Sequence, residues 1–129
     1  MYLLDTNVCI DFIDARNEAV RRRIVEQVSM GLSVSAITAA ELLVGAKNSE
    51  DPKNDKEKAQ RFLSIVRPRD FDLEAANAYV QVVEKLGIHR RSFDRLIAAH
   101  ALSLGLTLVT NNEKDFADVP GLVVENWTV

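Results

Sequence analysis

Three acidic residues stand where they could bind a divalent metal ion. Asp5 directly follows a short apolar run, and Glu41 and Asp94 each stand near the start of a segment of helical character. Carboxylates without nearby thiolates or paired histidines suit a hard ion such as Mg²⁺ or Mn²⁺ and disfavour zinc. Such an ion can orient and acidify water and stabilise the charge that develops on an attacked phosphodiester. The chemistry that these acids favour is therefore hydrolysis of nucleic acid.

Each acid also has an explanation that involves no function. Asp5 could cap the helix after it, because Asp is a preferred N-cap residue. Glu41 could complete a capping box whose first member is Thr38. Asp94 could complement the dipole of the helix that it opens. These explanations are local, and they do not predict that the acids meet at one place.

The segments that would position these acids alternate between strand and helix. Strands are predicted at residues 2–4, 32–35, 69–72, 106–110 and 122–125, and helices at residues 8–14, 18–30, 59–66, 73–86 and 93–104, with a further helix capped by Thr38. This alternation favours a three-layer α/β/α fold with a mostly parallel central sheet. Ligands of such sheets gather beyond the carboxyl ends of the strands, so the acids are expected to converge there.

One single domain, residues 1–129, is expected from the length. Residues 47–58 are almost wholly polar, and Pro52 stands among several turn formers, so we expect an exposed connection there rather than a domain linker. No apolar run approaches the roughly 18 residues of a membrane span, and a cytoplasmic protein is expected. The single cysteine, Cys9, stands among apolar residues and is predicted to be a reduced, packed thiol.

The formal net charge of -3 argues against a generic basic nucleic-acid binder. It does not exclude RNA as a substrate, because a metal ion adds positive charge where a phosphate would bind. Basic residues cluster at residues 21–23, at Arg67 and Arg69, and at residues 89–91 with Arg95. Such clusters are usually solvated faces, so they are secondary evidence for a substrate surface.

The sequence lacks the motifs that other phosphate-binding and hydrolytic sites require. The chain has no Gly-x-x-x-x-Gly-Lys phosphate loop and no Gly-x-Ser-x-Gly elbow. A metal-free, histidine-based nuclease would need two positioned imidazoles. His100 shares a helix face with apolar residues and is predicted to be packed, and His89 has no evident base partner.

Four different motifs follow one another along nearly the whole chain. They are residues 3–7 (LLDTN), residues 35–42 (SAITAAEL), residues 94–101 (DRLIAAHA) and residues 108–112 (LVTNN), the last followed by Asp115-Phe116 and by residues 119–122 (VPGL). In these motifs the chain resembles the PIN-domain ribonucleases, and among them the VapC-type toxins of bacterial toxin-antitoxin pairs. Each motif is weak alone, and the four together make a strong joint signal.

The resemblance implies a site, an activity and partners. Asp5, Glu41 and Asp94 would be the shared metal-binding and catalytic acids, with Thr6 supporting Asp5. The implied activity is that of a Mg²⁺- or Mn²⁺-dependent endoribonuclease that stops translation by cutting RNA. A VapB-type antitoxin would wrap the toxin with its carboxyl-terminal segment and block the acids. Relatives commonly form homodimers as well as hetero-oligomers with the antitoxin.

The fourth position of the site departs from the family pattern. Many relatives place an acid where this chain has Asn112, so either Asn112 or the nearby Asp115 would complete the site. This departure keeps open a PIN-like RNA-binding module with impaired catalysis. A haloacid-dehalogenase-type phosphatase is a further alternative because Asp5 follows an apolar strand, although Asn7 stands where that family has a second Asp.

Overall fold

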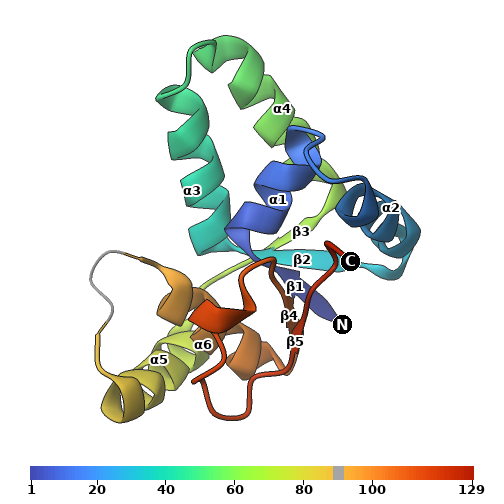
Figure 1. Ribbon diagram of the computed structural model, residues 1–129. Helices are drawn as coiled ribbons and strands as arrows, with labels where there is room; N and C mark the ends of the chain where they lie inside the picture. Colours follow the sequence, from blue (N-terminus) through green and yellow to red (C-terminus); the bar gives the residue numbers. More distant parts are fainter. Residues whose placement is uncertain (89–91) are drawn as a thin grey trace.

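Five parallel strands form the central sheet of the molecule (Figure 1). The computed structural model describes residues 1–88 and 92–129. The strands are β1 (Tyr2–Leu4), β2 (Leu32–Ser35), β3 (Arg67–Arg69), β4 (Thr107–Val109) and β5 (Val124–Glu125), and their order in the sheet is β3-β2-β1-β4-β5. The predicted α/β fold with a parallel sheet is confirmed.

Helices cover both faces of this sheet (Figure 1). One face carries α1 (Thr6–Ile13), α2 (Glu18–Gln27), α3 (Ala36–Lys47) and α4 (Pro52–Ile65), and the other carries α5 (Leu73–Leu86) and α6 (Asp94–Leu104). Short 3₁₀ turns follow at Val28–Met30 and Glu113–Asp115. Successive residues of a strand point to opposite faces, so Leu4 belongs to the first core and Leu3 to the second. Burial on both faces explains why the strands read as short apolar runs.

The strand register sets which residues meet at the carboxyl edge of the sheet. Leu4 of β1 is opposite Val34 of β2 on one side and Val109 of β4 on the other. The ladder continues one step further, since the Asp5 N–H donates to the Val109 carbonyl at 2.8 Å. The ends of the three strands therefore lie side by side, with Asp5 between Ser35, the last residue of β2, and Thr110, which follows β4.

The predicted capping box at the start of α3 is wrong. The N-cap is Ser35, whose Oγ accepts the Ile37 N–H at 3.1 Å, so the helix already begins at Ala36. Thr38 lies inside the first turn, and its hydroxyl bonds the Thr6 hydroxyl instead of a helix amide. A serine at the end of β2 supplies the cap earlier than the sequence pattern indicated, and Glu41 is left without a capping role.

The polar stretch 47–58 is also not the exposed connection that we expected. Only residues 48–51 connect the helices, because α4 begins at Pro52 and its N-cap Asp51 accepts the Asn54 N–H at 3.3 Å. Proline is favoured in the first turn of a helix, so the apparent breaker is a helix start. The predicted strand at residues 69–72 is instead β3 at Arg67–Arg69, and it includes Pro68, which an edge strand tolerates.

Several other expectations agree with the structure. Asp72 caps α5 by accepting the Ala75 N–H at 3.0 Å, and Cys9 and His100 are fully buried. The basic cluster at residues 89–91, His89 included, lies outside the described residues. Within residues 1–88 and 92–129, no helix combines the length and the apolar character that a bilayer crossing requires.

The same substitution at two glycines should have opposite effects on stability. Gly105 ends α6 with φ +65, where an L side chain is strained, so Gly105→Ala should lower the free energy of unfolding by about 1 kcal/mol. Gly45 lies within α3, and a Cβ there meets no atom within 4 Å, so Gly45→Ala should raise it by roughly 0.5–1 kcal/mol. Urea denaturation measures both, and equal signs would contradict these backbone assignments.

Candidate metal-binding active site

Asp5 is the centre of the candidate site. It lies between β1 and α1 and is 3% exposed, although it carries a carboxylate. Its Oδ1 accepts the N–H of Thr6 at 2.8 Å, and its Oδ2 accepts the hydroxyl of Thr110 at 2.9 Å. Both oxygens are thus held by neighbours on α1 and beyond β4, which fixes the orientation of the carboxylate.

The environment of Asp5 disfavours its negative charge. Burial is the largest influence, and it raises the pKa of the carboxyl from 3.8 to about 6 together with the charges of Asp94 and Glu41. The hydrogen bonds from Thr110 and Thr6 act in the opposite direction and lower the pKa. Asp5 is therefore close enough to the other two predicted acids to be affected by their charges.

Thr6 joins Asp5 to Glu41. The Thr6 hydroxyl donates to Oε1 of Glu41 at 2.8 Å, across 35 residues of sequence. A threonine hydroxyl has a single hydrogen, so the 3.0 Å bond between Thr6 and Thr38 must run from the Thr38 hydroxyl to Thr6 Oγ1. The predicted supporting role of Thr6 thus has a geometric basis, because its backbone holds one acid and its side chain holds another.

Asp94 reaches the site from the opposite face of the sheet. It is the first residue of α6 and is half-buried, and its backbone N–H donates to the hydroxyl oxygen of Ser92 at 3.0 Å. Its charge raises the pKa of Asp5 more than the charge of Glu41 does. Glu41 and Asp94, which come from distant segments of the sequence, therefore both raise the pKa of Asp5, as expected if the three acids converge.

The donor atoms at this point fit a hard divalent cation. They are carboxylate and hydroxyl oxygens, and the mutual repulsion of the acids is a cost that a cation would relieve. Among the described residues, no three His, Cys, Asp or Glu side chains are gathered tightly enough to enclose a metal ion. Mg²⁺ commonly keeps several waters and uses only one or two carboxylates directly, so it does not require a closed cage.

Asn112 and Asp115 contact each other at the edge of the site. The Asn112 side-chain amide donates to Oδ2 of Asp115, and both residues are exposed. The Asn112 backbone N–H donates to Thr110 Oγ1 at 3.1 Å, so Thr110 links Asn112 to Asp5. The charge of Asp115 is not among the influences on Asp5. The fourth position predicted from the sequence stays a prediction.

Thr110 and Thr38 are site residues that the sequence argument did not assign. Each is fully buried, and each hydroxyl donates to an atom of the network around Asp5. Asn111 adds a contact at the rim by donating to Oδ2 of Asp11 on α1 at 2.8 Å. Thr110 directly follows an apolar strand, and this position was visible in the sequence. That this strand, β4, pairs with β1 and so places Thr110 beside Asp5 is known only from the order of the sheet.

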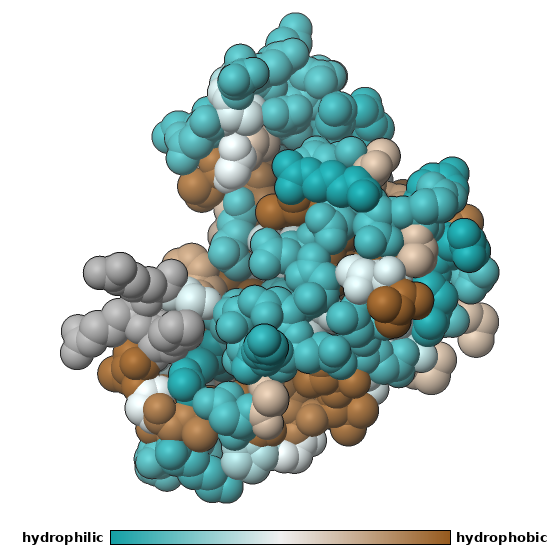
Figure 2. All heavy atoms as spheres, viewed as in Figure 1, coloured by the Kyte–Doolittle hydropathy of each residue, from teal (hydrophilic) through white to brown (hydrophobic). Residues whose placement is uncertain are grey.

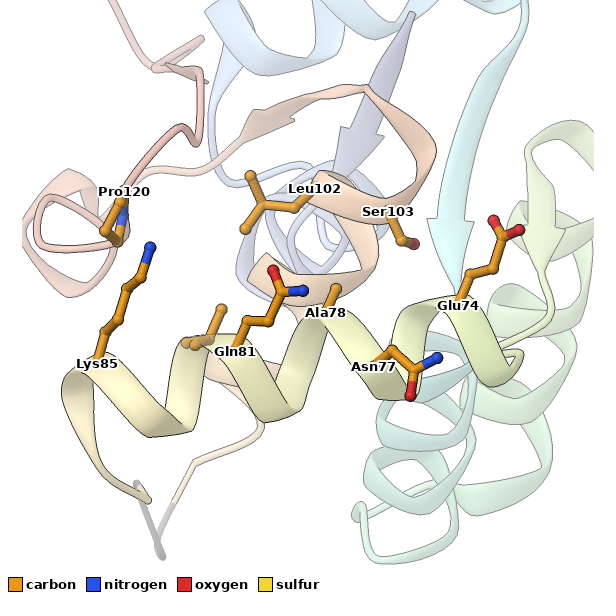
Figure 3. A pocket seen from close by; sticks show the side chains of 9 residues that line it. Glu74, Asn77, Ala78, Gln81, Lys85, Leu102, Ser103 and Pro120 are labelled. Atoms are coloured by element: carbon orange, nitrogen blue, oxygen red, sulfur yellow. The ribbon is translucent and has the colours of Figure 1, made fainter.

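One hollow of the surface has a predicted acid in its wall, and a larger one lies away from the acids. A hollow of about 330 Å³ lies among α1, α3 and α4, and Glu41 forms part of its wall. A larger one of about 420 Å³ lies between α5 and α6 and is lined by polar residues that include Asn77, Gln81 and Lys85 (Figure 3). None of the predicted acids lines the larger hollow. The chemistry therefore points to the smaller one, beside the α3–α4 hairpin, where the mostly hydrophilic face in Figure 2 is hollowed.

Comparisons with known proteins identify the family of the chain. The family model of the PIN domain matches residues 2–122. The tRNA(fMet)-specific endonuclease VapC of Shigella flexneri is 36% identical over 98% of each chain, and Ribonuclease VapC2 of Rickettsia felis is 32% identical over 98% of each chain. The crystal structure of DNA-bound VapBC from Salmonella typhimurium contains a chain that is 35% identical, with a TM-score of 0.89 and coverage of 98% of this chain and 97% of that one.

The raised pKa of Asp5 predicts how stability depends on pH without metal. The native pKa of about 6 exceeds the value of 3.8 for an unperturbed group, so the native state binds more protons between these values. The contribution of Asp5 is therefore fully present below pH 3.8 and is lost as the pH rises past 6. The full difference corresponds to roughly 3 kcal/mol.

Asp5→Asn isolates this contribution, because Asn cannot ionise. In EDTA, the stability of the variant relative to the wild type should increase as the pH is raised from about 4 to about 7, as measured by urea denaturation. A difference that stays constant over this range would show that Asp5 does not titrate there. Adding Mn²⁺ at neutral pH should raise the melting temperature of the wild type more than that of Asp5→Asn.

Proposed function

The chain belongs to the PIN-domain ribonucleases, among the VapC-type toxins of toxin-antitoxin pairs, and on this premise we propose that it is a Mg²⁺- or Mn²⁺-dependent endoribonuclease that inhibits translation. The family match covers residues 2–122, and the relatives match over nearly their full length. Metal dependence and the effect on translation are the parts that go beyond family membership. The phosphatase alternative has no comparable support.

One observation carries the metal-dependent proposal. Thr6 bonds both Asp5 and Glu41, so two acids that are far apart in the sequence are held in one network, while the charge of Asp94 acts on the same point. A protein has no structural need to bring three carboxylates together, since their mutual repulsion is destabilising. The arrangement supports a site that gains its full stability only with a bound cation.

The residues of the chain would then divide the work of hydrolysis. Asp5, Glu41 and Asp94 would hold the cation. When bound, the cation would lower the pKa of a water molecule and stabilise the charge on the attacked phosphodiester. Thr110 and Thr6 keep Asp5 in one orientation, and Thr6 does the same for Glu41. These bonds pre-organise the acids before substrate arrives, which is where such a site gains catalytic power.

We propose RNA as the substrate, with initiator transfer RNA as the first to test. The proposal rests on the relative from Shigella flexneri, which is named as a tRNA(fMet)-specific endonuclease. A negatively charged protein with a net charge of -3 would bind RNA weakly at its acidic edge unless a cation offset the carboxylates. RNA binding near Asp5 should therefore depend on the metal ion.

We also propose that an antitoxin segment of the VapB type covers the hollow beside Glu41. Its walls are largely apolar, with Ile10, Ile13 and Leu42 on α1 and α3, and Glu41 adds a carboxylate. Such a surface fits a segment with apolar side chains and a basic residue that reaches the acid. The similarity to a chain of a VapBC assembly supports a partner of this kind.

Substituting the acids should abolish cleavage without unfolding the protein. Asp5→Asn and Glu41→Gln should each reduce cleavage of initiator transfer RNA by at least about 100-fold in Mn²⁺, because each removes a charge that holds the cation. The glutamine introduced by Glu41→Gln retains an oxygen that can accept the Thr6 hydroxyl, so the melting temperature should change little. Cleavage is followed on denaturing gels, and EDTA should stop it in the wild type.

Glu74→Gln is the matched control. Glu74 is an exposed acid in the other hollow, so its variant should cleave at the wild-type rate. Wild-type activity in Asp5→Asn and Glu41→Gln would refute the catalytic assignment. Tight RNA binding without any cleavage by the wild type would instead identify a PIN-like binding module.

Filling the hollow beside Glu41 should weaken antitoxin binding. Gly45 lines this hollow and has open space around it, so Gly45→Arg adds bulk and a positive charge that would repel the basic residue of the segment, without a clash inside the fold. Affinity for the antitoxin encoded next to this chain should fall at least about tenfold, or about 1.4 kcal/mol, by calorimetry. Val80→Arg, at an exposed position on α5, should leave the affinity unchanged.

A further inference from the structure

His100 makes one directed contact between the two helices that carry acids. It lies on α6, which Asp94 begins, and its Nδ1 is 2.8 Å from the Oγ of Ser35. Ser35 is the N-cap of α3, the helix that carries Glu41. Both His100 and Ser35 are fully buried. The contact therefore joins the start of α3 to the middle of α6 inside the protein.

Packing alone explains this histidine poorly. Ile97, one turn earlier on the same face of α6, is buried and apolar, so packing on this face does not call for a polar group. Nε2 has no hydrogen-bond partner of good geometry in the described part of the chain, and a buried polar atom without a partner is costly. The ring gains an edge contact with Phe71, whose centroid lies 5.2 Å away. What the histidine adds over an apolar residue is thus its polar contact with Ser35 and with the backbone of Asp70.

The ring is suited to an uncharged hydrogen bond. Burial is the main influence that lowers the pKa of His100 below 6.5, although the Asp70 backbone and the Asp72 charge act against it. A neutral imidazole has one nitrogen that donates and one that accepts. The Ser35 hydroxyl can therefore donate its hydrogen to Nδ1 of the neutral ring. Its oxygen still accepts the Ile37 N–H at 3.1 Å.

We propose that the bond between His100 and Ser35 sets the position of α6 relative to α3 and thereby the distance from Asp94 to Glu41, so that His100 is a positioning residue for the acidic site. The proposal rests on the proposed function only for the role of Asp94 and Glu41 in binding the cation. A bond at this place acts on both helices at once, because it meets α3 at its cap and α6 in its buried middle. A loss of the bond leaves each helix intact but frees their relative placement.

The test compares variants that differ in this bond. His100→Leu keeps an apolar side chain of similar size and removes the bond, and His100→Asn keeps a polar group near the place of Nδ1. Ile97→Val is the matched control, since Ile97 is buried on the same helix and its side chain makes no polar contact. Each variant is characterised by melting temperature, by kcat and KM for RNA cleavage, and by Mn²⁺ affinity without RNA.

His100→Leu should lower kcat and Mn²⁺ affinity between about 10- and 100-fold, which is typical for a lost supporting bond at a metal site, with KM changed less than about twofold. His100→Asn should recover most of both losses. Ile97→Val should lower the melting temperature yet keep both values. Ser35→Ala removes the same bond together with the N-cap of α3, so Ser35→Ala combined with His100→Leu should be no worse than Ser35→Ala alone.

A measurement without activity separates this proposal from the proposed function. Spin labels on cysteines introduced at Lys47 of α3 and Ser103 of α6 report the distance between the helices, and Cys9 is buried and should stay unlabelled. The distance distribution should broaden in His100→Leu and narrow again in His100→Asn. An unchanged distribution, or equal losses in His100→Leu and Ile97→Val, would overturn the positioning role. If the wild type neither cleaves RNA nor binds Mn²⁺, the proposed function fails while the spin-label result still decides this inference.

Discussion

The burial of Asp5 at the end of the central strand is the constraint on which the rest of the site depends. A carboxylate that is 3% exposed is costly unless donors surround it. One donor is the N–H of the next residue, Thr6, and the second, the Thr110 hydroxyl, comes from the parallel register, because β1 lies between β2 and β4 and Thr110 therefore follows β4 beside Asp5. A different strand order would leave the same aspartate without its second donor. The order of the sheet thus decides whether this chain can keep an acid there at all.

The hydroxyl groups around Asp5 also fix the orientation of the Glu41 carboxylate. Each has one hydrogen, so Thr38 donates to Thr6, Thr6 donates to Glu41, and Thr110 donates to Asp5. This network fixes directions but does not remove the repulsion between the charges, and the pKa of Asp5 stays raised at about 6. The chain therefore retains an unfavourable interaction at one place within an otherwise well-packed fold. Such local costs are typical of sites that bind something.

The sequence predicts the strands and the acids of this site better than the hydroxyl groups that hold the acids. The bounds of β1 and β2 and the positions of Asp5, Glu41 and Asp94 follow from apolar runs and their ends. The capping box failed because Ser35 caps α3 before Thr38 can, and Glu41 instead accepts the Thr6 hydroxyl across 35 residues of sequence. The bond from Thr110 to Asp5 spans 105 residues and depends on the strand order. Local patterns contain neither contact, so a pattern argument can locate the acids but not the hydroxyls that hold them.

Glu41 belongs both to the network of acids and to the hollow among α1, α3 and α4. On the proposed function, a basic side chain of an antitoxin at Glu41 and a metal ion at the acids would both offset the same negative charge. Each would weaken the electrostatic attraction for the other, since binding free energies at linked sites are reciprocal. Inhibition then needs no rearrangement of the fold. A segment seated in the apolar hollow can keep RNA away from Asp5 and also reduce the affinity for the cation that catalysis requires.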